Sequence, residues 1–445
     1  MKARSLCFLV LGEAVLLSIP WINVARAESG GAHQDPIADA LLALAIILVA
    51  ARVGAHVATR LSQAAVLGEL IAGVLLGNLV LLGVADLGWM AQDGMIDALA
   101  RLGVILLLFE VGLESTVGQM MRVGGSALLV AVLGVVTPFA LGWGVGHVLL
   151  PEAGVYAHAF IGATLSATSV GITARVMKDL GHGQSNEARI IVGAAVIDDV
   201  LGLVILAVVT GVIQAAASGG SLSAGDTLLI LGRSLGFLVA ALIGGMLLSR
   251  RVFRAASTLD ASGVLLALAL GFCFFLSWAA NAIGLAPIVG AFAAGLVLEE
   301  AHFVDFVGRG EKQLEEVLQP ITSFLVPIFF VVMGMRTDLR AFAAPGVLVV
   351  AACLTLAAVL GKQACAFGVL GGAADRWTVG LGMIPRGEVG LIFANIGLGL
   401  SVNGQPIIST ALFSAIVVMV IVTTMVTPPL LKWSMGRTAR VPRVA

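Results

Sequence analysis

Charged residues are scarce in this sequence. Only 11% of its 445 residues are charged and 59% are hydrophobic, whereas soluble domains carry about 25% charged residues. The basic residues are scattered over short polar loops, and the formal net charge is −1. This composition predicts an all-α membrane protein that crosses the bilayer several times, and it argues against a water-soluble enzyme and against a nucleic-acid partner.

Cysteine is also scarce, and the four cysteines lie singly in apolar segments. Isolated thiols have neither the spacing of a zinc site nor the pattern of a disulfide framework. The sequence shows no nucleophile–base arrangement and no phosphate-binding loop. We therefore expect no cofactor and no enzymatic activity. A short cytoplasmic tail, 434–445, follows the last apolar segment, so we expect no soluble C-terminal domain.

The N-terminus has the composition of a secretory signal. Residues 1–27 contain two early basic residues, an apolar run, and small residues at Ala25 and Ala27 before the first acidic residue. This pattern predicts a cleaved signal peptide followed by a short extracytoplasmic tail, 28–36. A retained N-terminal helix is the alternative.

Thirteen apolar segments follow, and we expect them to be transmembrane helices because about 20 apolar residues span a bilayer core. They are 37–59, 63–83, 95–114, 125–149, 155–178, 187–214, 226–249, 262–283, 286–301, 316–335, 345–371, 376–400 and 406–433. The segment 286–301 is short enough to be re-entrant. Basic residues concentrate in alternate loops, apart from Arg336 and Arg340. The positive-inside rule then predicts an external N-terminus and a cytoplasmic C-terminus in a bacterial inner membrane.

Thirteen segments divide into two halves of six, with 226–249 as a linker helix between them. The two halves then cross the membrane in opposite directions, which is the inverted-topology architecture of secondary transporters. Corresponding segments are 125–149 with 345–371, 155–178 with 376–400, and 187–214 with 406–433.

One pair of corresponding segments is interrupted in both halves. Segment 155–178 is polar and broken by glycine, and segment 376–400 is broken near its middle by proline and glycine. Discontinuous helices in matching positions indicate a substrate site near the midplane. A proline kink with glycine packing would explain one segment but not both. The polar and helix-breaking residues are Thr168, Ser169, Pro385, Arg386 and Glu388.

Two further segments carry charge at the same depth. Segment 187–214 contains the adjacent carboxylates Asp198 and Asp199, and segment 345–371 contains a single charge, Lys362. A carboxylate at the bilayer centre costs about 2.5–3.5 kcal/mol, so a cation site or a proton relay is the expected role. A purely structural ion pair is the alternative. At about 1.5 Å per helical residue, these groups and the two breaks lie roughly 14–18 Å from the inner boundary.

These motifs resemble those of a known family. VIDDVLG, TSVGITARV, LGKQA and MIPRGEVGLIFA, together with the less specific LGELIAGVLLGN, resemble bacterial monovalent cation:proton antiporters of the Kef and NapA type. The resemblance covers about 37–433. Kef-type potassium systems have Gln at the position of Asp198, and many carry a nucleotide-binding C-terminal domain. This sequence departs from both features and is closer to the NapA type.

The resemblance implies an NhaA/NapA-like fold with two broken, crossing helices, and a homodimer. A dimerisation domain would comprise 37–114 and 262–335, and a mobile core would comprise 125–214 and 345–433. By resemblance, Asp199 alternately binds cation and proton, while Asp198 pairs with Lys362.

We predict exchange of Na⁺ or Li⁺ for protons by alternating access, with net movement of charge. The two carboxylates, the hydroxyls of Thr168 and Ser169 and the carbonyls of the broken helices are hard oxygen ligands for a small cation. Arg386 and Glu388 are assigned a supporting role, pairing locally to fix the break at Pro385. The first alternative is K⁺/H⁺ exchange, because sequence does not fix cavity size. A sodium-coupled organic-anion symporter, which a central lysine does not suit, and a cation channel are weaker alternatives.

Overall fold

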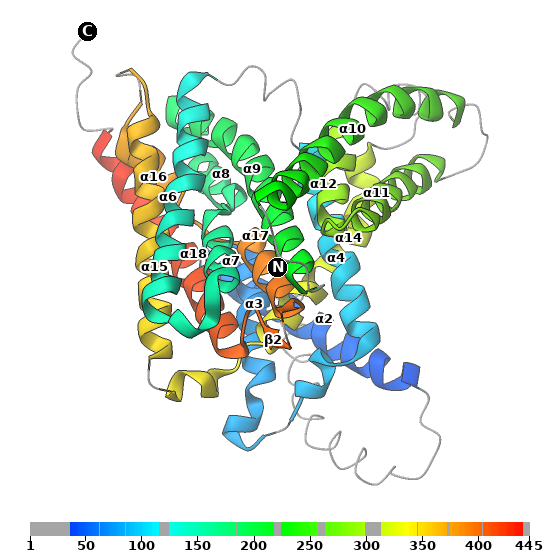
Figure 1. Ribbon diagram of the computed structural model, residues 1–445. Helices are drawn as coiled ribbons and strands as arrows, with labels where there is room; N and C mark the ends of the chain where they lie inside the picture. The colour runs from blue at the N-terminus through cyan, green and yellow to red at the C-terminus, as the bar shows by residue number, and fades with distance from the viewer. Residues whose placement is uncertain are drawn as a thin grey trace. The chain divides into compact units, whose positions relative to one another are not determined.

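The structure is a computed structural model, and it describes residues 36–438 apart from short gaps. The gaps are 62, 85, 115–123, 181, 184, 218–223, 257–262, 299–312, 345, 372–373 and 403. The predicted signal peptide, 1–27, lies outside the described residues, as do most of the predicted tails at both ends. The described chain is almost entirely helical (Figure 1). Within it, eight helices are long and apolar enough to cross a membrane, judged by length and composition.

The chain folds as two units, of which unit 1 comprises the described parts of Met1–Val104, Ile321–Leu348 and Thr410–Val417. Its elements are α2 (Pro36–Arg60), α3 (Ala65–Gly77), the 3₁₀ turns η1 (Leu79–Leu82), η2 (Gly88–Ala91) and η5 (Leu339–Ala343), the first half of α4 (Gly94–Glu114), most of α14 (Leu314–Met335) and the start of α18 (Thr410–Thr438).

Unit 2 comprises the described parts of Ile105–Pro320, Val349–Ser409 and Val418–Ala445. Besides the remainders of α4, α14 and α18, its elements are α6 (Gly125–Leu149), η3 (Pro151–Ala153), α7 (Gly154–Ser166), α8 (Val170–Asp179), α9 (Asn186–Ala217), α10 (Ala224–Ala256), α11 (Val264–Ala282), α12 (Pro287–Val297), most of α15 (Val347–Gln363), η6 (Ala364–Gly368), α16 (Arg376–Gly382), α17 (Glu388–Leu398), β1 (Ser401–Val402) and β2 (Gln405–Pro406). The predicted dimerisation and transport domains are defined by contacts within a dimer and by movement during transport. The division into two units does not test them, so they stay predictions.

Each predicted apolar segment contains a described helix, but several helices differ from the predicted length. Helix α3 ends at Gly77, where predicted segment 63–83 continues as the 3₁₀ turn η1. Helix α12 has only 11 residues, and all its residues from Ile288 onward are buried. The predicted segment 406–433 starts at the last residue of the short antiparallel β1–β2 hairpin, and its helix, α18, runs from Thr410 to Thr438.

Glycine allows the helices of unit 1 to pack backbone against backbone. A Cβ on Gly54 of α2 would overlap the backbone of Gly68 on α3, and the reverse is also true. On the same helix α3, Gly73 faces the backbone of Val331 on α14 in the same way. Small residues at helix contacts are typical of proteins in lipid, where close van der Waals packing drives association.

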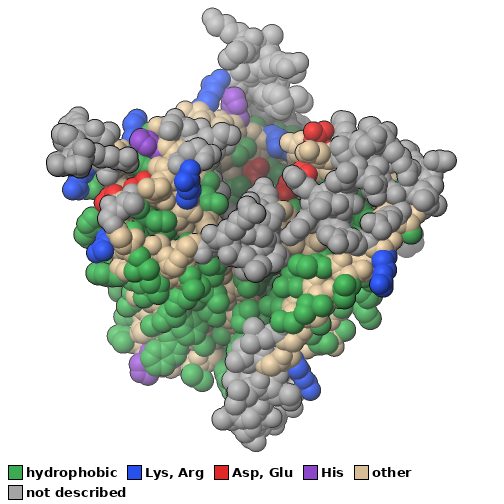
Figure 2. All heavy atoms as spheres, turned by 90° about the horizontal axis from the view of Figure 1, so that it is seen from above, with side chains coloured by type: hydrophobic (Ala, Val, Ile, Leu, Met, Phe, Trp, Pro, Cys, Tyr) green, Lys and Arg blue, Asp and Glu red, His purple; other side chains and the backbone are tan. Residues whose placement is uncertain are grey.

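Hydrophobic side chains cover much of the face shown in Figure 2. Large apolar residues such as Val148, Trp278 and Phe367 are exposed. Extended exposed apolar surface is unusual for a soluble monomer and is expected where lipid replaces water. The described chain is therefore an all-helical, multi-pass membrane protein.

Candidate functional site

Two helices of unit 2 are interrupted where the sequence predicts breaks. Helix α7 ends at Ser166 and α8 begins at Val170, so residues 167–169 are not helical. Helix α16 ends at Gly382 and α17 begins at Glu388. Each break frees backbone N–H and C=O groups that would be satisfied in a continuous helix.

The two breaks contact each other directly. The backbone N–H of Ser169 donates a 2.9 Å hydrogen bond to the carbonyl of Pro385. The hydroxyl of Thr173 on α8 donates at 2.6 Å to the carbonyl of Gly382, the last residue of α16. A Cβ on Gly387 would overlap the side chain of Ser169, so this approach requires glycine. Because lipid cannot satisfy freed backbone groups, their mutual hydrogen bonding stabilises the crossing.

A buried ion pair lies at one end of this crossing. The ammonium of Lys362 on α15 donates to Oδ1 of Asp198 on α9 at 3.0 Å. It also donates at 2.9 Å to the carbonyl of Ser166, the last residue of α7. The side chains of Lys362 and Asp198 are 0% and 1% exposed. The pair of Asp198 with Lys362 that the family resemblance implies is therefore present, and Lys362 also binds the end of the broken helix.

Several buried polar atoms at this site have no hydrogen-bond partner within the described part of the chain. They are Oδ2 of Asp198, Oγ1 of Thr168, and Nε and Nη1 of Arg386. A buried polar atom without a partner costs about 1–3 kcal/mol, so such atoms mark places where a water or an ion completes the bonding. Two of these atoms are oxygens, the donor type that suits Na⁺. Among the described residues no group of three or more His, Cys, Asp or Glu side chains resembles a fixed metal centre.

Comparison with known proteins identifies the family. The profile of the transmembrane sodium/hydrogen exchanger family matches residues 42–433. This chain belongs to the sodium/hydrogen exchanger family. The chain is 38% identical to the high-affinity Na⁺/H⁺ antiporter NhaS3 of Synechocystis, over 94% of this chain and 95% of that protein. It is 34% identical to the Na⁺/H⁺-K⁺ antiporter GerN of Bacillus cereus, over 88% and 95%.

Its fold matches that of a solved exchanger structure. The sodium proton antiporter MjNhaP1 from Methanocaldococcus jannaschii at pH 8 superposes with a TM-score of 0.68 and 17% sequence identity, covering 91% of this chain and 99% of that chain. At this identity the likeness concerns the fold alone. Family membership makes the protein a membrane transporter and not an enzyme, as the sequence predicts.

Arg386 of this exchanger is completely buried beside the ion pair. Its Nη2 donates to the carbonyl of Ala358 on α15 at 3.4 Å. Its own carbonyl accepts from the hydroxyl of Thr424 at 3.2 Å, and its N–H donates to Thr423 Oγ1 at 3.4 Å. The predicted partner Glu388 begins α17, but its side chain lies outside the described residues.

The exchanger's other predicted site residues occupy different positions around the crossing. Asp199 is half-buried on α9. Because successive helical residues point about 100° apart, its carboxylate leaves the helix in a different direction from that of Asp198. Thr168 and Ser169 are both buried in the break. Sequence reasoning missed the threonines of α18 that hold Arg386, although two adjacent hydroxyls in an apolar segment are a usable signal.

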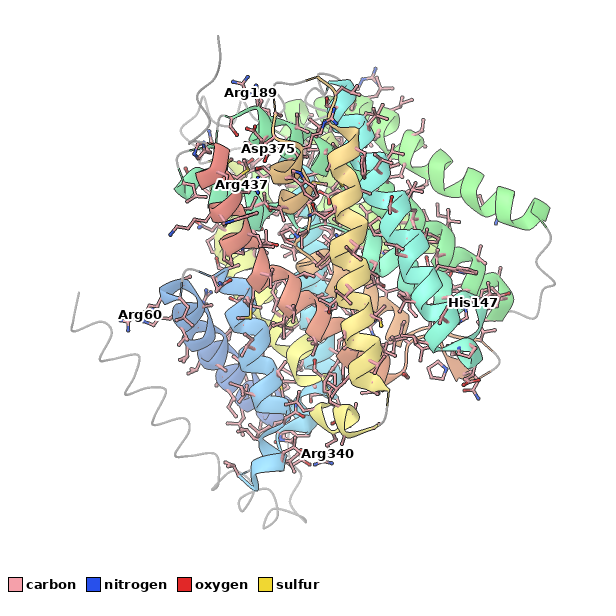
Figure 3. All side chains as sticks on the ribbon, turned by 90° about the vertical axis from the view of Figure 1, so that its left-hand side faces the viewer. Arg60, His147, Arg189, Arg340, Asp375 and Arg437 are labelled. Atoms are coloured by element: carbon pink, nitrogen blue, oxygen red, sulfur yellow. The ribbon has the colours of Figure 1, made fainter. Side chains whose placement is uncertain are left out.

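A second hydrogen-bonded cluster fixes the far end of the exchanger's short helix α16. The carboxylate of Asp375 caps this helix, accepting from the N–H of Thr378 at 3.1 Å and from its hydroxyl at 2.6 Å. Thr378 also contacts Ser434 of α18 at 2.6 Å, and the N–H of Asp375 donates to Glu187 of α9 at 2.9 Å. Figure 3 shows Asp375 and Arg189 of α9 at the same end of unit 2. The cluster thus holds α9, α16 and α18 together beyond the crossing.

Proposed function

We propose that this exchanger moves Na⁺ across the membrane in exchange for protons, by alternating access, with Li⁺ as a second substrate. The observation that carries the proposal is the buried Asp198–Lys362 pair at the crossing of two broken helices. One oxygen of that pair, Asp198 Oδ2, has no partner among the described residues. The two relatives named above are both Na⁺/H⁺ antiporters by name and align over most of their length.

Competition for oxygen ligands couples the two ions. Asp199 is the carboxylate that binds either the cation or a proton, because a protonated carboxyl group cannot ligate Na⁺ well. The oxygens of Asp198, Thr168 and Ser169 complete the shell with carbonyls of the breaks. Hard cations prefer oxygen ligands of this kind. One site exposed alternately to each side then suffices, without a separate proton channel.

The lysine makes the exchange electrogenic, with about two protons moved for each Na⁺. When Na⁺ draws Asp198 into its shell, the bond from Lys362 to Asp198 breaks. A desolvated ammonium without a counter-ion releases its proton. Na⁺ entry therefore expels one proton from Asp199 and one from Lys362, and both return when the empty site reorients. A membrane potential, at about 2.3 kcal/mol per charge per 100 mV, then drives Na⁺ outward.

The same proposal includes the architecture inferred from the sequence. Thirteen spans form two inverted six-helix repeats around the linker 226–249, with the N-terminus outside and the C-terminus in the cytoplasm of a bacterial cell. Two observations support it: each predicted segment contains a described helix, and both α7–α8 and α16–α17 are broken. The protein would act as a homodimer. The dimerisation domain would be 37–114 with 262–335, and the transport core 125–214 with 345–433.

The test is proton flux in proteoliposomes that contain the purified protein. A fluorescent pH probe inside acidified vesicles reports dequenching when Na⁺, Li⁺ or K⁺ is added outside. We expect dequenching with Na⁺ and Li⁺ and little with K⁺. An equal response to K⁺ would favour K⁺/H⁺ exchange, the second candidate that the name of the GerN relative suggests. A large single-channel conductance in a planar bilayer would instead indicate a channel.

A further inference from the structure

Lys362 faces a stretch of α6 that contains a proline. Helices α6 and α15 run side by side in both Figure 1 and Figure 3. Gly361 of α15 lies so close to Pro138 of α6 that a Cβ would stand 2.8 Å from the proline Cα. One turn further along, the thiol of Cys365 donates to the carbonyl of Val130 at 3.4 Å. The lysine therefore projects beside the backbone of α6 between residues 130 and 138.

Pro138 leaves one carbonyl of α6 without its normal donor. In an α-helix the carbonyl of residue 134 accepts the N–H of residue 138, and proline has no N–H. Pro138 lies inside the helix Gly125–Leu149, so the carbonyl concerned is that of Gly134. A carbonyl without a donor at membrane depth is costly, and such carbonyls are tolerated where they line a site.

Gly134 is also the residue of α6 that adjoins the ion pair. A Cβ built on it would stand 3.2 Å from the Lys362 ammonium, 2.9 Å from the Cys365 sulfur and 3.6 Å from Oδ1 of Asp198. The absence of a side chain therefore leaves the backbone of α6 open to the lysine. The ammonium has three N–H donors. Two of them bind Asp198 and the carbonyl of Ser166.

We propose that the carbonyl of Gly134 takes the place of Asp198 as an acceptor for Lys362 and receives its N–H when Na⁺ draws Asp198 away. This inference rests on the proposed exchange. Both the ammonium and the neutral amine can donate, so the carbonyl holds the side chain in place through release and return of its proton. Pro138 keeps the acceptor available and Gly134 gives it room. Both are positioning residues, because they act through the lysine.

The variant that tests the proposal is Pro138→Ala, which returns an N–H to the helix and occupies the Gly134 carbonyl. The Na⁺-bound state then loses one hydrogen bond, and the empty state, with Lys362 on Asp198, does not. We expect the apparent KM for Na⁺ to rise about three- to tenfold, the effect of one net hydrogen bond, with little change in maximal rate. Pro327→Ala on α14 is the matched control, since it restores an N–H to a helix of unit 1 and should leave this KM unchanged.

The decisive comparison repeats Pro138→Ala in a Lys362→Gln background, where the lysine is absent. The rise in the apparent KM for Na⁺ should disappear in that background, whereas a rise caused by a general distortion of α6 would persist. If the Gln variant does not turn over, stabilisation of the detergent-solubilised protein by Na⁺ gives the same comparison without transport. Pro138→Gly, which also restores the N–H, replaces Pro138→Ala if that variant does not fold.

Two results would overturn the proposal: an unchanged KM in Pro138→Ala, or an equal rise with and without Lys362. These results differ from a failure of the proposed function. If the wild-type protein shows no Na⁺-dependent proton flux, the exchange itself is wrong. If the wild type exchanges normally and only the effect of Pro138→Ala is missing, the role of the Gly134 carbonyl alone is refuted.

Discussion

The buried ion pair between Asp198 and Lys362 can be tested by a double-mutant cycle, in which we expect the two single variants to lose different amounts of stability. The substitutions are Asp198→Asn, Lys362→Gln and both together. Each keeps the approximate shape of the side chain and removes its charge. Breaking a buried pair by removing one partner costs about 3–5 kcal/mol, because the remaining charge is left uncompensated in an apolar environment. The pair is almost completely inaccessible, so solvent cannot screen that cost.

The two single losses should differ because Arg386 is also buried at the site and interacts electrostatically with both partners. In Lys362→Gln the carboxylate of Asp198 keeps the nearby guanidinium, and it can also take up a proton. In Asp198→Asn the carboxylate is gone, and even when Lys362 releases its proton the guanidinium of Arg386 stays buried without that partner. An arginine cannot lose its proton. We therefore expect Asp198→Asn to lie at the upper end of the range and Lys362→Gln at the lower end.

The double variant should lose much less than the sum of the single losses. Two neutral amides leave no uncompensated charge, and a glutamine at position 362 can still donate to the carbonyl of Ser166. The expected loss is about 1–3 kcal/mol, the cost of a weakened hydrogen-bond arrangement. The two single losses together amount to roughly 6–10 kcal/mol. The interaction energy of the cycle is therefore several kcal/mol, at or above the usual upper limit for contacting residues.

The assay is equilibrium unfolding of purified protein in mixed micelles, with thermal stability in detergent as a second measure. The pair between Arg336 and Asp97 is the matched control, since its 2.5 Å contact is partly exposed, with side chains 22% and 24% accessible. Solvent and the neighbouring Arg101 reduce its coupling to about 1 kcal/mol or less. Additive losses for the buried pair would refute the interaction, and a larger loss for Lys362→Gln would refute the role given to Arg386.

The remaining predictions concern ion exchange and unit 1. Asp199→Asn should leave the protein folded but abolish Na⁺-dependent proton release, and substantial exchange in that variant would remove Asp199 from the ion site. Exchange by the wild type should respond to a potassium–valinomycin potential, whereas Lys362→Gln should be electroneutral; equal voltage sensitivity in the two proteins would contradict release of the second proton by the lysine. Arg52 donates to the carbonyl of Ser323. This carbonyl has no helical donor, because the residue four positions later is Pro327, which has no backbone N–H. Arg52→Gln should therefore lower thermal stability, and Pro327→Ala should suppress that loss; a loss of the same size in the double variant would show that the arginine acts elsewhere.

The breaks, and the common depth of Asp198 and Lys362, are predictable from local rules, whereas the pairing of these two residues is what the family resemblance implies. Proline and glycine interrupt a helix wherever the fold places them. The fixed rise of a helix brings Asp198 and Lys362 to one depth without knowledge of the packing. The contacts between the breaks are not predictable in this way. The bond from Ser169 to Pro385 joins residues more than 200 positions apart, and no local pattern specifies it.

Helix ends in unit 1 show a second limit of the sequence pattern. Apolar residues continue to position 83, yet α3 ends at Gly77 because Asn78 turns the chain. Its amide donates to the carbonyls of Val74 at 2.8 Å and Thr337 at 2.7 Å, and its Oδ1 accepts the N–H of Leu339. A hydropathy pattern alone does not predict that the hydrogen bonds of one polar side chain end a helix at this position. Arg336, an exception to the positive-inside pattern, is explained in a similar way, since its charge is paired with a carboxylate.

In each unit a backbone carbonyl that lacks a helical donor accepts a hydrogen bond from a cationic side chain. In unit 1 the Ser323 carbonyl receives Arg52, which also interacts electrostatically with the carboxylate of Glu69. In unit 2 the carbonyl of Ser166, at the C-terminus of α7, receives Lys362. That helix end also carries a partial negative charge that stabilises an ammonium. The difference lies in Asp198, which adds a second acceptor that a cation can take away. In the exchange that we propose, Na⁺ draws Asp198 away from Lys362, whereas the bond from Arg52 to Ser323 only holds two helices of unit 1 together.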